Sequence, residues 1–514
     1  MPGAAPVALS RGTRRIVGAG GVGLVGMVLV VVGVAQPGSP FTTKLPGAWI
    51  FGVPGPGAGG AGHELLGIAL VYGGLVVVLS AWYRIVRDVT FAPSAGKGSL
   101  RGLSGILALW VAPLLVAPPL FSRDVYTYGA EGELVARGIN PYTHGLESLG
   151  RSRFLALADP LWRRAHAPYG PVFFDIARVN AHVSSTVFAT LEGYRLVAIL
   201  GVVLMAVSVP VLARSFDRDP APALALAVLN PLVLLYLIGG MHNDAIMLGL
   251  LVAGVALARR GHPAVGIVVC AVGAAVKVPC LLGVVFIGWD WAGTGASPRR
   301  RVGHVGASLS VALAAMAVVS AASGLGWAWL WNLSDPGNVT TWLDPATAVG
   351  LAISRVVHVA GGAAHTQGLV VATRAAALVV AGVIVCVLVL RTDRYGMPRA
   401  LGWSLLAVVF LGPIVWPWYE TWGIVFLALA VDAWSRRVVL VLSALACFAT
   451  VPAHVTAGPA DVVEASAGLA VVGAAAVLWL AHTRGVAGAT SDPSREGPVR
   501  VPAPGADEQS PPSS

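Results

Sequence analysis

Long apolar runs separated by short polar connections make up most of the chain. The first run covers residues 16–35 and follows three arginines within the first fifteen residues. A cleaved signal peptide has a similar layout, but its apolar core is usually about 7–15 residues long, so we expect an uncleaved membrane span. Further runs lie at residues 64–83, 103–120, 194–213, 222–238, 244–258, 262–276, 279–291, 303–324, 375–390, 399–415, 419–434, 437–452 and 463–482. Several are shorter than the ~20 residues that a full crossing needs, so the pattern predicts an all-α polytopic membrane protein with about 12–14 transmembrane helices.

The composition agrees with this pattern and narrows the function. Of the 514 residues, 56% are hydrophobic and only 11% are charged, and the mean hydropathy is +0.78. A soluble domain does not have this composition. The net charge of +10 does not indicate a nucleic-acid partner, because basic residues in polytopic proteins mainly set topology. The four cysteines include no C-x-x-C pair, so neither a zinc site nor a disulfide framework is indicated.

Basic residues cluster in the loops that follow every second apolar run. These residues are Arg84, Arg87, Lys97, Arg101, Arg214, Arg218, Arg259, Arg260, Arg299, Arg300, Arg301, Arg391, Arg394, Arg436, Arg437 and Arg484. The positive-inside rule then predicts that both termini are cytoplasmic and that the large loops 121–193 and 326–374 are extracytoplasmic. We expect one transmembrane domain over residues 1–482. The segment 483–514 is rich in proline, serine and charge, which predicts a disordered cytoplasmic tail.

The first segment rich in both charges and aromatics covers residues 121–144 and reads FSRDVYTYGAEGELVARGINPYTH. Ser122 is a plausible N-cap, which would place Asp124 in the first turn of a helix. Asp124, Tyr128 and Glu131 then share one helical face, because their spacing is i, i+4, i+7. This spacing predicts an amphipathic helix at the membrane surface, with Asp124 where the preceding span leaves the bilayer. The alternative is a helix whose acids are only solvated.

Five further polar or aromatic segments map to the same side of the membrane. His242-Asn243-Asp244 and Lys277 lie at span edges, where helix capping and an interfacial lysine are the alternative explanations. The others are the APYGP segment with Tyr169, the WPWYE segment with Trp418 and Tyr419, and the second loop with Trp327, Trp329, Trp331, Asp335, Trp342 and Asp344. Interfacial tryptophans can be a plain anchoring belt, or they can stack on sugars. The grouping of Asp124, His242, Asp244 and Lys277 on one side favours a functional site there.

These segments also carry a family resemblance. SRDVYTY, NPYTHG, APYGPVF, NPLVLLYLIGGMHNDAIMLGLL, KVPCLLGVVF and WPWYETW resemble the actinobacterial alpha-1,6-mannopyranosyltransferases over roughly residues 60–480. Members of that family are polytopic GT-C glycosyltransferases that use polyprenyl-phosphate mannose. They often have glutamine at the position of Trp416, a departure that bears on the acceptor.

The resemblance implies an inverting transfer of mannose to a mannan or lipoglycan acceptor, with alpha-1,6 linkages, in lipomannan and lipoarabinomannan core assembly. The base would be Asp124, which takes the proton of the acceptor hydroxyl, and its place in a helical first turn favours the ionised form. Lys277, Arg123 and His242 would bind the donor phosphate. Sugar or acceptor binding would involve Tyr128, Tyr169, Asn243, Asp244, Trp418 and Tyr419, with Asn243 and Asp244 also able to orient His242. No DxD motif accompanies Asp124, so the residues do not support metal dependence and do not decide it, and no cofactor is expected.

Two other functions remain compatible with the sequence. A glycolipid transporter or flippase would place ionisable groups near the middle of the bilayer. Here the spans are nearly free of acids and the polar groups lie at the outer edge, which favours an enzyme. A GT-C arabinofuranosyltransferase would share the architecture and differ in its donor, so a donor assay separates the two.

Overall fold

The computed structural model describes residues 11–37, 39–41, 49–50, 53–54, 61–91, 96–333, 339–341 and 344–449. The expected span 463–482, the expected tail 483–514, Asp335 and Trp342 lie outside the described residues. The first half contains α1 (Arg11–Val34), β1 (Trp49–Ile50), β2 (Val53–Pro54), α2 (Ala61–Phe91), α3 (Gly96–Val111), η1 (Ala112–Val116), α4 (Asp124–Ala136), η2 (Leu146–Leu149), η3 (Pro160–Trp162), α5 (Pro171–Val183), α6 (Val187–Ser215), α7 (Pro220–Ala227) and the π-helix η4 (Val233–Gly239). The second half contains α8 (Asp244–Arg259), α9 (Pro263–Ala274), η5 (Val278–Cys280), α10 (Leu281–Trp291), α11 (Pro298–Ser323), η6 (Ala328–Leu330), α12 (Pro345–Val359), α13 (Thr366–Leu390), α14 (Thr392–Tyr395), α15 (Met397–Phe410), η8 (Pro417–Glu420), α16 (Thr421–Ala430) and α17 (Ala433–Phe448). β1 and β2 pair antiparallel over two residues each.

The helices confirm an all-α polytopic membrane protein. Among the described residues, six helices are long and apolar enough to cross a membrane, and the bent pair η4–α8, with 118° between its halves, makes seven at most. Four shorter apolar helices of 10–17 residues accompany them. This number of full-length helices is smaller than the 12–14 expected from the apolar runs.

Part of the difference is the run 463–482, which lies outside the described residues, and part comes from apolar runs that form short helices, such as α16 and α7. Every residue of α16 is buried, and α7 is buried from Ala221 to Ala227. A helix that is hydrophobic on all sides is enclosed by other elements, whether or not it crosses the bilayer. At 1.5 Å per residue, the ten residues of α16 extend about 15 Å, which is half of the ~30 Å hydrocarbon thickness.

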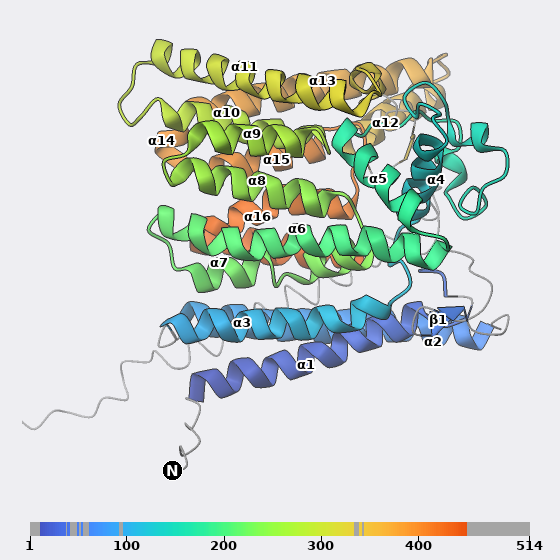
Figure 1. Ribbon diagram of the computed structural model, residues 1–514, viewed down its shortest axis with the longest axis horizontal. Helices are drawn as coiled ribbons and strands as arrows, with labels where there is room; N and C mark the ends of the chain where they lie inside the picture. Colours follow the sequence, from blue (N-terminus) through green and yellow to red (C-terminus); the bar gives the residue numbers. More distant parts are fainter. Residues whose placement is uncertain are drawn as a thin grey trace, which may run out of the picture. The chain divides into compact units, whose positions relative to one another are not determined.

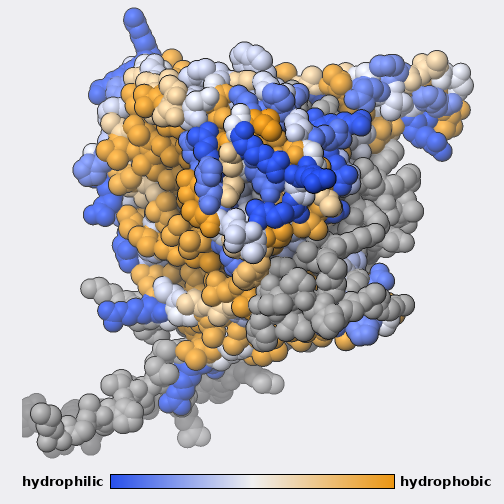
Figure 2. All heavy atoms as spheres, turned by 45° about the vertical axis from the view of Figure 1, so that its right-hand side comes forward, coloured by the Kyte–Doolittle hydropathy of each residue, from blue (hydrophilic) through white to orange (hydrophobic). Residues whose placement is uncertain are grey.

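The helices lie side by side, and their connections gather at two ends. α1, α2 and α3 pack together, and α6 packs along α8, while α4 and α5 stand at one end of the stack (Figure 1). The face that contains this end shows hydrophilic residues above an apolar flank (Figure 2). At the other end, Arg259 pairs with Asp290 at 2.9 Å and its Nη2 donates to the carbonyl of Ser215 at 3.0 Å. The last turns of α6, α8 and α10 therefore meet there, far along α8 from Asp244.

The helix that begins at Asp124 differs from the amphipathic surface helix that we expected. Every residue of α4 from Val125 to Val135 is buried. α5, α6 and η2 pack around it. The sequence pattern is wrong here because Gly129 and Gly132 let α4 pack closely against Phe154 and Ala177, and the following loop covers Glu133. Asp124, Tyr128 and Glu131 still share one face, but this face points into the protein.

Candidate functional site

Backbone hydrogen bonds join the start of α4 to the break between η4 and α8. The amide of Leu120 donates to the carbonyl of Gly239 at 3.0 Å. A Cβ at Gly239 would lie 2.4 Å from Cδ1 of Leu120, so any larger residue here would require the Leu120 side chain to move. Phe121, with φ of 61°, then turns the chain into α4. These contacts place Asp124 beside His242.

A second pair of backbone bonds brings the APYGP segment to the turn that contains Lys277. The amide of Gly170 donates to Val276 at 3.1 Å, and the amide of Val172 donates to Ala275 at 3.0 Å. A Cβ at Gly170 would lie 2.2 Å from the Ala275 carbonyl oxygen, so only glycine fits. Tyr169 is therefore held next to Lys277.

A carboxylate connects the start of α12 to the WPWYE segment. The amide of Val415 donates to Oδ1 of Asp344 at 2.7 Å. Asp344 is fully buried, and burial raises its pKa to about 7. This aspartate therefore holds the segment that leads into η8, where Trp418 and Tyr419 lie.

Asp124 is the first residue of α4, and its amide donates to Oγ of Ser122 at 3.1 Å. The N-cap position is Arg123 rather than Ser122. The side chain of Asp124 is 19% exposed. Burial raises the pKa of Asp124 to about 7, while the charge of Lys277 lowers it. We expected the helix terminus to favour the ionised form, but desolvation outweighs it because the carboxyl lies among buried groups.

His242 faces Asp124 from the break between η4 and α8. Its Nδ1 lies 2.7 Å from the carbonyl oxygen of Tyr236, and its Nε2 lies 3.8 Å from Oδ2 of Asp124. The ring stacks on Trp418 with 4.0 Å between centroids and 23° between planes. The side chain of His242 is 0% exposed, so it has no open surface for a phosphate. Its Nε2 faces Asp124 instead.

Lys277 lies in a cage of aromatic rings and a carboxylate. Its Nζ donates to both oxygens of Asp244, at 2.9 and 3.0 Å. Nε1 of Trp422 donates to Oδ1 of Asp244 at 2.6 Å. The ammonium also lies 4.2 Å from the ring centre of Tyr419 and 5.8 Å from that of Tyr169. The pair is buried, so Lys277 is not an interfacial lysine that reaches for water.

The aromatic candidates form two layers. Tyr169 and Tyr419 are half-buried and flank Lys277. Tyr128 is buried behind Tyr169, with 5.5 Å between ring centroids and the rings edge to face. Trp418 is buried between His242 and Trp416. Tyr169 and Tyr419 are therefore the rings that can contact a ligand, and Tyr128 and Trp418 support them.

Two further candidates carry polar groups that other described residues leave available. Asn243 is 4% exposed, and neither Oδ1 nor Nδ2 of its amide has a hydrogen-bond partner within the described part of the chain. Nε of Arg123 donates to the carbonyl of Leu157 at 3.0 Å. In the same described ranges Arg123 forms no ion pair. An amide and a guanidinium with free donors are suited to a polar or anionic ligand.

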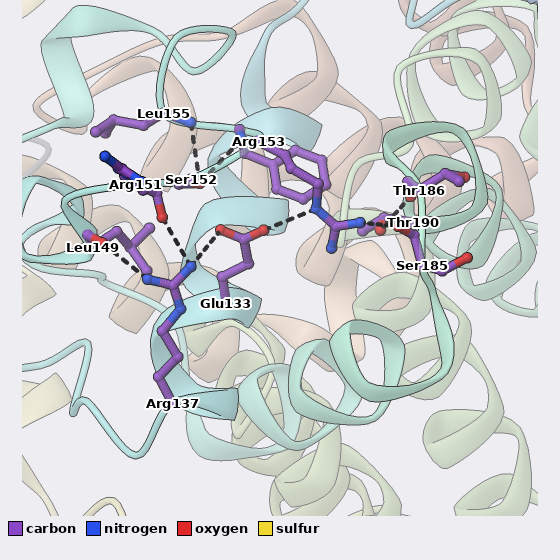
Figure 3. A network of polar contacts seen from close by, with 11 residues as sticks. Glu133, Arg137, Leu149, Arg151, Ser152, Arg153, Leu155, Ser185, Thr186 and Thr190 are labelled. Carbon is purple, nitrogen blue, oxygen red and sulfur yellow. Dashed lines mark hydrogen bonds and ion pairs between the residues drawn. The ribbon is translucent and has the colours of Figure 1, made fainter.

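Two glutamates on α4 have different surroundings. Glu131 is buried, Oε2 of its carboxyl has no partner among the described residues, and burial raises its pKa well above the ordinary value. Glu133 lies between Arg153 at 3.2 Å and Arg137 at 3.6 Å (Figure 3). Arg137 also donates to the carbonyls of Leu149 and Arg151, so this network fixes the loop that covers α4.

Sequence reasoning missed two residues of this site. Trp422 binds Asp244, and the charge of Asp159 raises the pKa of Asp124. Glu131 lies on one face with Asp124, as the spacing predicted, and it is buried rather than solvated. Trp422 could have been found from its spacing, because it follows Trp418 by one helical turn. Within the described residues, no group of three or more His, Cys, Asp or Glu side chains is arranged to hold a metal ion.

Comparisons with known proteins identify the family of the chain. A family model described as alpha-(1->6)-mannopyranosyltransferase, N-terminal domain, matches residues 20–293. The chain belongs to the alpha-(1->6)-mannopyranosyltransferase family. A second model, the MptB C-terminal domain, matches residues 346–480. The protein is therefore a glycosyltransferase, and the residues gathered around Asp124 lie within the two matched ranges.

Individual relatives extend over most of the chain. The protein is 31% identical to alpha-(1->6)-mannopyranosyltransferase A of Mycobacterium tuberculosis over 455 residues, which cover 84% of this chain and 83% of the relative. It is 29% identical to alpha-(1->6)-mannopyranosyltransferase B of Corynebacterium glutamicum over 408 residues, which cover 72% and 67% of the two chains. No solved structure gives a significant match.

Proposed function

We propose that this mannopyranosyltransferase-family protein transfers mannose from polyprenyl-phosphate mannose to a mannan or lipoglycan acceptor. The product is an alpha-1,6 linkage formed with inversion, in lipomannan and lipoarabinomannan core assembly. The observation that carries the proposal is a single partly exposed carboxylate, Asp124, beside cationic and aromatic side chains from four other segments. Membership in the family supports the mannosyl transfer and the linkage.

Asp124 acts as the general base in this reaction. The acceptor hydroxyl oxygen attacks the anomeric carbon of the mannosyl donor from the face opposite the phosphate. The bond between that carbon and the phosphate oxygen breaks, and the hydroxyl proton goes to a carboxylate oxygen of Asp124. A beta-linked mannosyl phosphate thereby becomes an alpha-mannoside and a lipid phosphate. One base on the attacking side is sufficient for such a direct displacement.

The leaving phosphate needs positive charge or hydrogen-bond donors. Arg123 is the first candidate, because its guanidinium has free donors and no acidic partner in the described ranges. Lys277 is the second, although Asp244 compensates much of its charge. His242 is buried and turned toward Asp124, so we assign it no phosphate contact. Asp244 has both oxygens occupied, and it therefore positions Lys277 rather than binding sugar.

The sugar rings contact Tyr169, Tyr419 and Asn243. Half-buried aromatic rings offer apolar faces, and the unpaired amide of Asn243 offers one acceptor and two donors. Tyr128 and Trp418 keep these groups in place from behind. Donor and acceptor sugars thus have separate polar and apolar contacts around one carboxylate.

We propose a membrane orientation from the two ends of the helices. Arg259 and Arg301 lie at one end, where they pair with Asp290 and Asp393. By the positive-inside rule, these arginines support a cytoplasmic location for that end. In the proposed orientation both termini are cytoplasmic, and Asp124, at the other end, is extracytoplasmic.

The test is transfer by the purified protein in liposomes. We expect mannose to move from polyprenyl-phosphate mannose to a synthetic alpha-mannoside, with a new alpha-1,6 linkage identified by NMR. Polyprenyl-phosphate arabinose and a nucleotide-linked mannose are the comparison donors. Preference for the arabinose donor would assign the arabinofuranosyltransferase function instead. Movement of a glycolipid across the bilayer without a new glycosidic bond would support the transporter.

A further inference from the structure

The tautomer of His242 follows from its hydrogen bonds. Its Nδ1 lies 2.7 Å from the carbonyl oxygen of Tyr236. A carbonyl can only accept, so Nδ1 carries a proton and donates it. In the neutral ring, Nε2 then presents a lone pair. That lone pair has no hydrogen-bond partner among the described residues and faces Oδ2 of Asp124 at 3.8 Å.

We propose that His242 is a positioning residue that accepts the reaction proton from Asp124. This inference rests on the proposed function, in which Asp124 is the base. The acceptor hydroxyl gives its proton to a carboxylate oxygen of Asp124 as the new glycosidic bond forms. The resulting carboxyl O–H donates to Nε2 of His242, and the proton is held between the two groups. The proton passes to water when the product departs. Asp124 is then again a carboxylate beside a neutral imidazole.

The distance is suited to this role. At 3.8 Å, Oδ2 of Asp124 and Nε2 of His242 are too far apart for a hydrogen bond. This is expected while both atoms are unprotonated, because two acceptors cannot bond to each other. Once Asp124 is protonated, its O–H can form a hydrogen bond to Nε2 if the two groups approach by about 1 Å. Catalytic hydrogen bonds commonly shorten in this way when substrate binds. The imidazole cannot turn away, because the carbonyl of Tyr236 holds one edge and Trp418 holds one face.

The other groups around Asp124 do not take the same role. Lys277 is cationic and donates to Asp244, so it offers no lone pair. Asp244 is saturated by Lys277 and Trp422. Oδ1 of Asp159 accepts from the amide of Leu161 at 2.9 Å, and Ser122 accepts from the amide of Asp124. Of these groups, His242 is the one whose nitrogen lone pair is not already used in a described contact.

The experiment compares two substitutions that distinguish the role of Nδ1 of His242 from the role of Nε2. His242→Asn keeps an amide N–H near the position of Nδ1, so the bond to Tyr236 survives, but it removes Nε2. His242→Gln carries its amide to about the position of Nε2. We expect His242→Asn to lower kcat at least about tenfold, which corresponds to about 1.4 kcal/mol, and His242→Gln to restore part of this loss.

The dependence of kcat/KM on pH distinguishes this role from a structural one. In His242→Asn the protonated Asp124 loses its hydrogen-bond acceptor, so its ionised form is favoured and the acid limb moves to lower pH. A variant that only weakens packing lowers the curve without moving that limb. An unmoved limb, or a wild-type kcat in His242→Asn, would overturn the proposal.

Two controls keep the outcome clear. Asp124→Asn is measured in parallel: if it is inactive while His242→Asn is normal, the proton role of His242 fails and the proposed function stands. If Asp124→Asn is active, the proposed base itself fails. Nitrogen-15 NMR of the histidine-labelled wild-type protein gives a readout that does not depend on a folded variant. We expect His242 to show protonated Nδ1 and unprotonated Nε2 above pH 7, and the opposite tautomer would contradict the inference.

Discussion

Oδ2 of Asp124 and Nε2 of His242 face each other across 3.8 Å, although their segments are far apart in the sequence. The backbone hydrogen bond from Leu120 to Gly239 and the bond from Nδ1 of His242 to the carbonyl of Tyr236 place them there. A carboxylate at the start of a buried helix is thus held beside an imidazole whose other nitrogen is already bonded. This pair is the centre of the proposed site.

The pH dependence of the wild-type enzyme should follow Asp124. Burial raises the pKa of this carboxyl to about 7, and only the ionised form can accept a proton. The active fraction therefore grows as the pH rises through about 7. We expect kcat/KM to fall about tenfold for each pH unit below 6, measured with the lipid-linked donor in liposomes. A flat profile from pH 5 to 8 would show that Asp124 does not limit the reaction.

Removing the cation from the buried pair should destabilise the protein. Lys277→Met leaves the carboxylate of Asp244 buried without its cation, which typically costs about 3–5 kcal/mol. The double variant Lys277→Met with Asp244→Asn should recover much of the thermal stability in detergent, while transfer stays impaired. Lys277→Arg should keep part of the activity, because Arg can still pair with the carboxylate. Wild-type stability of Lys277→Met would contradict the observed pairing.

Arg123 should affect donor use more than folding. Arg123→Gln keeps a donor for the carbonyl of Leu157 but removes the charge. Losing a charge-assisted contact to a phosphate corresponds to roughly 1.5–3 kcal/mol, so the KM for the donor should rise about tenfold or more. Arg164→Gln is the matched control, since its side chain is 88% exposed and pairs only with Glu147 among the described residues. Equal KM values for both variants would remove Arg123 from the phosphate site.

The membrane orientation can be tested by cysteine labelling. His144 and Thr294 are both exposed and lie in loops at the two ends of the helices. Cys386 is exposed and is replaced by serine first, while Cys270, Cys280 and Cys447 are buried. An impermeant maleimide added to intact cells should label His144→Cys and leave Thr294→Cys unlabelled until the cells are opened. The reverse pattern would place the site on the cytoplasmic side.

The helical class could be predicted from hydrophobicity, but the number of crossings could not. Apolar runs identify helices that avoid water, and they do not separate lipid contact from burial in protein. α16 and α7 are the clear cases, because both are apolar and enclosed by other helices. α4 shows the opposite error: its glutamates suggested a surface, although Glu133 is neutralised by Arg137 at the end of the same helix and by Arg153 from the loop that covers it.

The members of the site could be predicted from the motifs, but the contacts between them could not. The motifs correctly brought Asp124, His242, Asp244 and Lys277 to one end of the helices. Which group pairs with which depends on side-chain directions that only tertiary packing sets. The sequence therefore offered Lys277 first, and then Arg123 and His242, as phosphate ligands, whereas the structure joins Lys277 to Asp244 and turns His242 toward Asp124.

The most direct test of the account is the turnover of Asp124→Asn. The substitution keeps the size and the hydrogen bonds of the side chain but cannot accept a proton. General-base catalysis contributes about 10²–10⁴-fold, so kcat should fall at least about a hundredfold while donor binding and thermal stability change little. Glu131→Gln is the matched control on the same helical face; burial raises the pKa of Glu131 and the proposed reaction gives it no proton to carry, so this variant should stay active. Normal turnover by Asp124→Asn together with an inactive Glu131→Gln would contradict the assignment of the base.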